Sequence, residues 1–80
     1  MLDSEHSHVV LEIPRGEENV LRLTRKVFEG KTFTDLRVFF MNGDGDFVPT
    51  RKGVSIRDHE LPQVLDMLQR IARKVAQGGR

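Results

Sequence analysis

The stretch "EGKTFTDLRVFF", residues 29–40, decides the fold, because its side chains alternate with the two-residue period of a β-strand. Its even positions are mostly small or aliphatic: Thr32, Thr34, Leu36, Val38 and Phe40. Its odd positions mix charges with aromatic rings: Lys31, Phe33, Asp35, Arg37 and Phe39. The pattern predicts a strand that turns Leu36 and Val38 toward a helix and presents cations and rings on its other face.

Three other segments have the character of strands: residues 8–13 (HVVLEI), 20–28 (VLRLTRKVF) and 47–56 (FVPTRKGVSI). Glu29 and Gly30 form a two-residue reversal, and "NGDGD" at residues 42–46 is the strongest turn signal in the chain. Pro49 lacks a backbone donor, which predicts an edge strand or a bulge there. The strands are therefore expected to pair antiparallel in chain order.

After residue 56 the apolar period changes to three and four residues, which predicts one amphipathic helix of four to five turns. Its apolar stripe consists of Leu61, Val64, Leu65, Leu68, Ile71, Ala72 and Val75. Asp58 is the expected N-cap, and glycines follow the helix at its end. The predicted fold class is α+β, with a four-stranded antiparallel sheet followed by a C-terminal helix.

The chain has 80 residues and no cysteine, so disulfides and thiolate metal sites are excluded as sources of stability. A domain of this size buries only about 60% of its unfolded surface, which favours oligomerisation as a supplement. The stripe that extends to Val75 is longer than a four-stranded sheet needs. We therefore expect a homodimer, in which a second copy covers the surplus.

Charge is unevenly distributed although the net charge is only +1. Residues 1–18 carry five acidic residues against Arg15, a sum of −4, whereas residues 19–80 carry twelve basic against seven acidic residues, a sum of +5. The acidic segment is interpreted as a solubilising tail, with competition for a basic groove as the alternative. No signal peptide or membrane-spanning run is recognised, so a soluble intracellular protein is expected.

Residues that could support catalysis or a metal site are scarce. The histidines are His6, His8 and His59, and they form no nucleophilic or acid–base arrangement with other residues, so no enzyme is expected. Asn42, Asp44 and Asp46 alternate as in a calcium loop, but the glycine and glutamate that such a loop requires are missing. No metal and no cofactor are predicted.

Basic and aromatic residues are better placed, because hairpin pairing would gather them on one curved face. Single-stranded nucleic acid needs cations for its phosphates and rings on which its bases stack. The competing interpretation is that the rings belong to the core and the cations are simply solvated.

The motifs F-x-G-K (Phe28 to Lys31), "TDLR" (residues 34–37), Phe39-Phe40 and "RKGVS" (residues 51–55) occur in this order before the helix. Together they resemble the single-stranded DNA-binding C-terminal domain of the transcriptional positive cofactor four family, including its small bacterial and phage relatives. The resemblance implies a curved sheet and dimerisation through the helices. It implies DNA contacts from Lys26, Phe28, Lys31, Arg37, Phe40, Arg51 and Lys52, and a dimer interface formed by the helix stripe.

Phe40 creates a conflict, because alternation places it with Leu36 and Val38 whereas the resemblance places an aromatic residue in the DNA-binding surface. An extra residue between Val38 and Phe40 would remove the conflict. The expected organisation is a tail over residues 1–8, a domain over 9–76 and a flexible end over 77–80.

The expected function is non-enzymatic binding of single-stranded or melted DNA in transcription or DNA maintenance. The alternatives are single-stranded RNA and an adaptor for the transcription machinery. The expected location is the cytoplasm, with the nucleoid, in a bacterium or phage and the nucleus in a eukaryote.

Overall fold

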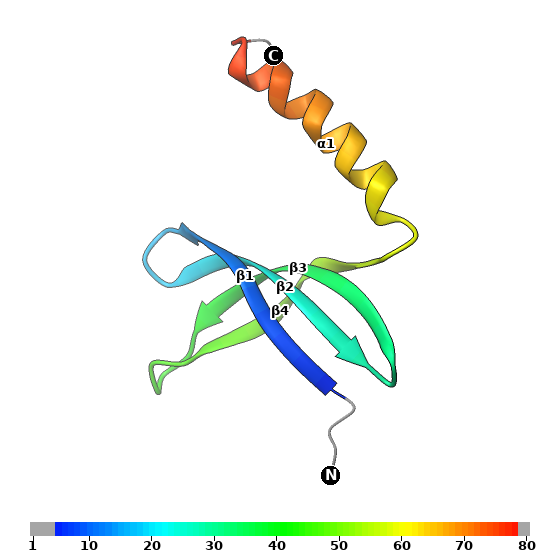
Figure 1. Ribbon diagram of the computed structural model, residues 1–80. Coiled ribbons are helices and arrows are strands. Elements are labelled where there is room, and N and C mark those ends of the chain that lie inside the picture. Colours follow the sequence, from blue (N-terminus) through cyan, green and yellow to red (C-terminus); the bar gives the residue numbers. More distant parts are fainter. Residues whose placement is uncertain (1–4, 79–80) are drawn as a thin grey trace.

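The computed structural model describes residues 5–78, which form one antiparallel sheet and one helix (Figure 1). The sheet has the strand order β1-β2-β3-β4, so each strand pairs with its neighbour in the chain. The elements are β1 (Glu5–Arg15), β2 (Asn19–Phe28), β3 (Lys31–Met41), β4 (Phe47–Arg57) and α1 (Leu61–Ala76). The α+β class and the order of elements predicted from the sequence are confirmed.

Both predicted hairpin turns are present between the central strands. Glu29 (φ 52°) and Gly30 (φ 78°) join β2 to β3, and two successive positive φ angles are what a two-residue hairpin needs. In the turn from β3 to β4, the Asn42 side-chain oxygen accepts hydrogen bonds from the N–H groups of Asp44 (2.9 Å) and Asp46 (3.0 Å). The "NGDGD" segment is therefore a hairpin turn, as predicted.

Strand β1 is longer than predicted, because it begins at Glu5 and continues through Pro14 to Arg15. Residues 5–8, which we had expected in the tail, pair with β2. Pro14 lies on an edge strand, where proline is tolerated in a sheet. A register shift between Val9 and Leu11 leaves Val10 as an extra residue.

Strand β4 contains the main irregularity of the sheet. Arg37 pairs with Gly53 and Phe39 pairs with Pro49, so three residues of β4, 50–52, lie opposite Val38 alone. The predicted parity switch in β3 was wrong, because the extra residues are on β4 and the β2–β3 ladder continues unbroken to Phe40. Phe40 therefore keeps the parity of Leu36 and Val38.

Glycine is required at position 53, where β4 resumes one-to-one pairing with β3 after the irregular segment. A Cβ built on this residue would lie 2.6 Å from the Leu36 carbonyl oxygen and 2.7 Å from the Arg37 Cα. These are backbone atoms that cannot move aside cheaply. Glycine thus lets β4 approach β3 closely beside Arg37.

The register gives the sheet two chemically different faces. The apolar face carries Leu11, Ile13, Leu21, Leu23, Leu36, Val38, Phe40, Val48, Val54 and Ile56, together with Arg25, Thr32 and Thr34 toward the β2–β3 turn. The basic face mixes cations with rings and carries Arg22, Lys26, Phe28, Lys31, Phe33, Arg37, Phe39, Phe47 and Arg57. Three of the four buried residues, Val20, Thr24 and Asp35, share the basic face, as expected if the sheet curls around it.

Helix α1 projects away from the sheet (Figure 1), and the extensive contacts between elements are those between neighbouring strands. No residue of α1 is buried, and Leu65, Leu68 and Ile71 are each about half exposed. The expectation that the helix covers Leu36 and Val38 was therefore wrong for a single chain. The helix also lacks the length and apolar character that crossing a bilayer would demand, and no other helix occurs among residues 5–78.

The start of α1 also differs from the prediction. Glu60, not Asp58, occupies the N-cap position, and it makes no side-chain capping bond. The Asp58 carboxylate instead accepts hydrogen bonds from Arg25 on β2, at 2.7 and 3.5 Å. The Glu60 carboxylate accepts one from the N–H of Arg57, at 2.9 Å. Pairing with a cation across the sheet thus replaces the capping role expected of Asp58.

Candidate nucleic-acid interface

Cations and aromatic rings alternate across the strands of the basic face. At one end, Phe33 on β3 pairs with Lys26 on β2 and with Arg57 on β4, so a ring lies between two cations. In the adjoining pair, Phe28 lies opposite Lys31. The register alone thus places these five side chains over three neighbouring strands, on one face.

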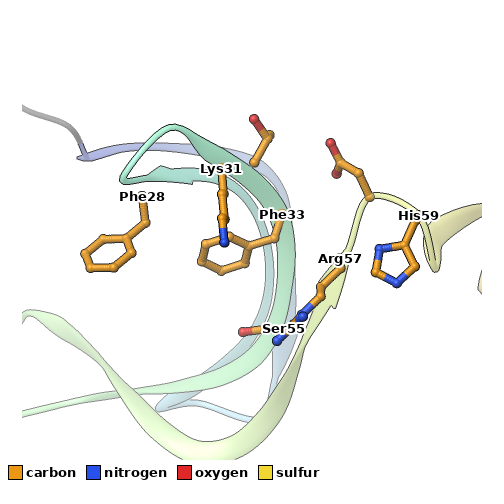
Figure 2. A pocket seen from close by; sticks show the side chains of 8 residues that line it. Phe28, Lys31, Phe33, Ser55, Arg57 and His59 are labelled. Carbon is orange, nitrogen blue, oxygen red and sulfur yellow. The ribbon is translucent and has the colours of Figure 1, made fainter.

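Four of these residues, all except Lys26, line a hollow of about 690 Å³ at the end of the basic face near the β2–β3 turn. Figure 2 shows the side chains of Phe28, Lys31, Phe33 and Arg57 directed into the space around which the sheet curls. The remaining lining residues are Thr32, Ser55, Asp58 and His59. The volume is within the range of about 300–1,000 Å³ that is typical of small-ligand sites.

A buried carboxylate holds the central cation of the face. Asp35 is 3% exposed, and both its oxygens accept hydrogen bonds from Arg37, each at 3.0 Å. Ser55 donates a further bond to Asp35 at 2.9 Å, and Arg37 also donates to the carbonyl of Thr50 at 3.0 Å. Burial raises the pKa of Asp35, but the bonds from Arg37 and Ser55 outweigh it, and the net pKa is lowered. The Arg37 guanidinium is therefore fixed in one orientation.

Arg22 extends the aromatic and cationic character toward the other end of the face. Its guanidinium carbon lies 4.3 Å from the centre of the Phe39 ring and 5.9 Å from that of Phe47. Both distances are compatible with cation–π attraction. The Nε of Arg22 also donates to Glu12 on β1 at 2.6 Å. The Arg22 charge is thus partly neutralised within the fold.

Asp58 is the acidic residue that lines the hollow, and its charge is countered from β2. The hydrogen bonds from Arg25 lower the pKa of Asp58 and keep it ionised, and the same contact raises the pKa of Arg25. The carboxylate is therefore engaged with a cation, while Lys31, Arg57 and His59 contribute donors to the hollow.

The structure brings together four of the residues predicted to contact DNA. Lys26, Phe28, Lys31 and Arg37 all lie on the basic face. Arg51 and Lys52 lie in the irregular segment of β4 and are exposed. In that segment the Thr50 hydroxyl donates to the Val38 carbonyl at 2.7 Å and accepts from the N–H of Lys52 at 3.1 Å.

Phe40 is the exception, because the unbroken β2–β3 register places it on the apolar face. It is 42% exposed there, beside Val48 on β4. The residues predicted to form a dimer interface all lie on α1, where Leu61 and Val64 are half-buried and the other five are exposed.

Sequence reasoning missed four residues of the basic face and its hollow: Arg22, Phe47, Arg57 and His59. The parity of β2 already placed Arg22 on the side of Lys26 and Phe28. Arg57 and His59 follow the predicted end of the last strand, and their position depends on the exact register of β4. Among residues 5–78, no three side chains able to ligate a metal gather in one place.

Comparisons with known proteins agree with this geometry. A family model described as Transcriptional Coactivator p15 (PC4) matches residues 16–67, which is more than half of the chain. The tetragonal crystal structure of a PC4 homologue from Burkholderia pseudomallei is similar, with a TM-score of 0.75 and 30% identity over 84% of this chain and 98% of that one. Its orthorhombic form gives a TM-score of 0.73 and 31% identity over 92% and 97%. Among curated proteins no match was found.

Proposed function

The chain belongs to the Transcriptional Coactivator p15 (PC4) family, and from that premise we propose that it binds single-stranded DNA through its basic face, without enzymatic activity. DNA binding and transcriptional coactivation characterise the family as a whole. The finer statement, that this chain takes unpaired or melted DNA with little overall sequence preference, is our proposal for this protein.

The observation that carries the proposal is the alternation of rings and cations on one concave face. Phe28 and Phe33 give flat apolar surfaces for unpaired bases, and stacking of this kind contributes about 1–3 kcal/mol per base. Lys26 and Lys31 are their direct cross-strand neighbours, within reach of the phosphates that connect those bases. Paired bases in a duplex hide the surfaces that the rings need, so unpaired DNA is the better ligand.

We also propose that the protein works as a homodimer joined through α1. Val20 is the only buried apolar side chain among the described residues, so the single chain has almost no core of its own. The apolar face and the α1 stripe both remain largely accessible. A second copy would bury both surfaces, at about 1.5–3 kcal/mol for each fully buried large side chain.

The first experiment is fluorescence anisotropy with an oligothymidine at several salt concentrations, on the parent chain and on Lys31→Glu. Lys31→Glu removes a phosphate contact and adds a repulsive charge, so affinity should fall at least tenfold. The log–log salt slope should become shallower by about 0.7 per lost phosphate contact. Lys74→Glu makes the same charge change on exposed α1 and should alter the affinity less than twofold. Equal affinity of Lys31→Glu and the parent would refute this placement of the DNA.

Competition with RNA and duplex DNA of the same sequence separates the remaining ligands. The proposal predicts that duplex DNA competes poorly with single-stranded DNA. Preferential displacement by RNA would show that the ligand is RNA instead, because stacking and phosphate contacts alone do not exclude a 2′-hydroxyl.

A further inference from the structure

We propose that Phe33 and Arg57 form a guanine-selective subsite on the basic face. In this subsite a guanine stacks on the Phe33 ring, and its N7 and O6 accept two hydrogen bonds from the Arg57 guanidinium. The inference rests on the proposed binding of single-stranded DNA. It adds a local sequence preference to a surface that otherwise contacts backbone and base planes.

The position of the two side chains supports this assignment. Phe33 and Arg57 are direct cross-strand partners on β3 and β4, and side chains of such pairs start only about 4.5–5.5 Å apart. Figure 2 shows both directed into the hollow, and in this view the Arg57 guanidinium lies next to Ser55. A base lying flat on Phe33 would therefore present one edge to Arg57.

The Arg57 side chain is also available for a ligand, as is that of Arg51 outside the hollow, whereas three other arginines of β2–β4 are engaged with carboxylates. Arg22 pairs with Glu12, Arg25 with Asp58, and Arg37 with Asp35. These three pairs hold their guanidinium groups against carboxylates of the fold. Within residues 5–78, the Arg57 side chain makes no such ion pair or hydrogen bond, and only its backbone N–H is engaged, with Glu60 at 2.9 Å.

The polar groups of the hollow determine which edge of a nucleobase can hydrogen-bond there. Two cations of the hollow, Lys31 and Arg57, can only donate hydrogen bonds, whereas the Asp58 carboxylate is occupied by Arg25. Guanine offers two adjacent acceptors, N7 and O6, whose spacing fits the arginine fork. Adenine replaces one of them with an amino donor, which would face the cation unfavourably. Of the two purines, guanine therefore has the edge that complements this site better.

The test uses thymidine oligomers of about 16 nucleotides, a length that covers the site sizes of small single-strand binders. Isolated positions carry guanine, adenine or 7-deazaguanine, which lacks the N7 acceptor. Anisotropy titrations on the full chain should show about fivefold or greater preference for guanine over adenine, the lower limit for one bidentate contact. The 7-deazaguanine oligomer should lose most of this preference.

Arg57→Lys keeps the charge but loses the fork, so it should reduce the guanine-to-adenine ratio to near one. Arg73→Lys on α1 makes the same exchange outside the basic face and should keep the parental ratio; circular dichroism checks that both variants fold. If the parent binds plain oligothymidine equally well but does not discriminate guanine, the subsite is wrong and the proposed function stands. A preference that survives in Arg57→Lys would also overturn it. No binding to any oligomer would refute the proposed function and the subsite together.

Discussion

The two faces of the sheet differ in how fully their side chains find partners within a single chain. On the basic face the buried polar groups find partners within the chain, as the bonds from Arg37 and Ser55 to Asp35 show. The apolar face has no comparable cover, and Val54 remains 53% exposed. Helix α1, which is amphipathic enough to provide that cover, points away from it (Figure 1). A single chain therefore satisfies the polar groups of its basic face but leaves apolar side chains of the other face exposed.

The largest expected effect concerns the exposed apolar stripe of α1. In an isolated chain Leu68, which is 53% exposed, should tolerate Leu68→Asp at a cost of less than about 0.5–1 kcal/mol. In a dimer joined through α1 the same change would place a charge in the interface and remove about 2–3 kcal/mol of apolar burial per subunit. Sedimentation velocity should show loss of the dimer, and thermal melting should show a large fall in Tm.

Gln69→Asp is the matched control, because it introduces the same side chain on the polar side of α1. It should retain the parental sedimentation and melting. Identical behaviour of Leu68→Asp and Gln69→Asp would mean that the α1 stripe stays open to solvent in solution. The exposed apolar face of the sheet would then be a property of the monomer in solution.

The second effect tests how closely β4 and β3 must approach on the basic face. Gly53→Ala would place a methyl group against the backbone at Leu36 and Arg37, so strand separation or local rearrangement should cost about 1–3 kcal/mol. Gly43→Ala is the control, because its Cβ would meet nothing within 4 Å. Urea unfolding monitored by circular dichroism compares the two, and equal midpoints would contradict the close approach.

The third effect is a pH dependence that arises from Asp35. Its lowered pKa in the folded chain means that its stabilising contribution is present above the ordinary carboxyl pKa of about 3.9. That contribution is lost as pH falls through the lowered folded value. Asp35→Asn should therefore cost about 1.5–3 kcal/mol near neutral pH, the value of hydrogen bonds to a charged group, and a smaller amount below about pH 4.

Unfolding free energies of the parent and Asp35→Asn across pH 2–7 measure this difference. The two curves should converge as the solution becomes acidic. A constant separation at every pH would show that the carboxylate charge contributes nothing to the basic face.

Local periodicity explains why so much of the sheet could be predicted. The alternation from Lys31 to Phe40 assigned Arg37 and Phe39 to one face and Leu36 and Val38 to the other, and the β2–β3 register confirms it. Turn chemistry at Gly30 located the first central hairpin correctly. These features depend on neighbours within a few residues, which a single sequence displays directly.

The features that could not be predicted depend on contacts between distant residues. Asp58 has the sequence context of an N-cap, yet Arg25, far away in the chain, provides a stronger partner for its carboxylate. The position of Arg57 beside Phe33 follows from two extra residues in β4; Pro49 marked an edge strand or bulge there, but not the number of extra residues. The direction of α1 relative to the sheet is likewise not encoded by alternation or helical period.

The irregular segment of β4 has a consequence for how the length of this chain can change. Because residues 50–52 oppose Val38 alone, the insertion amounts to an even number of residues, and side chains on both sides of it keep their faces. Deleting one residue there would turn Phe47 and Pro49 to the opposite surface, whereas deleting two would leave them where they are. Tolerated insertions and deletions at this position should therefore change the length of β4 by an even number of residues.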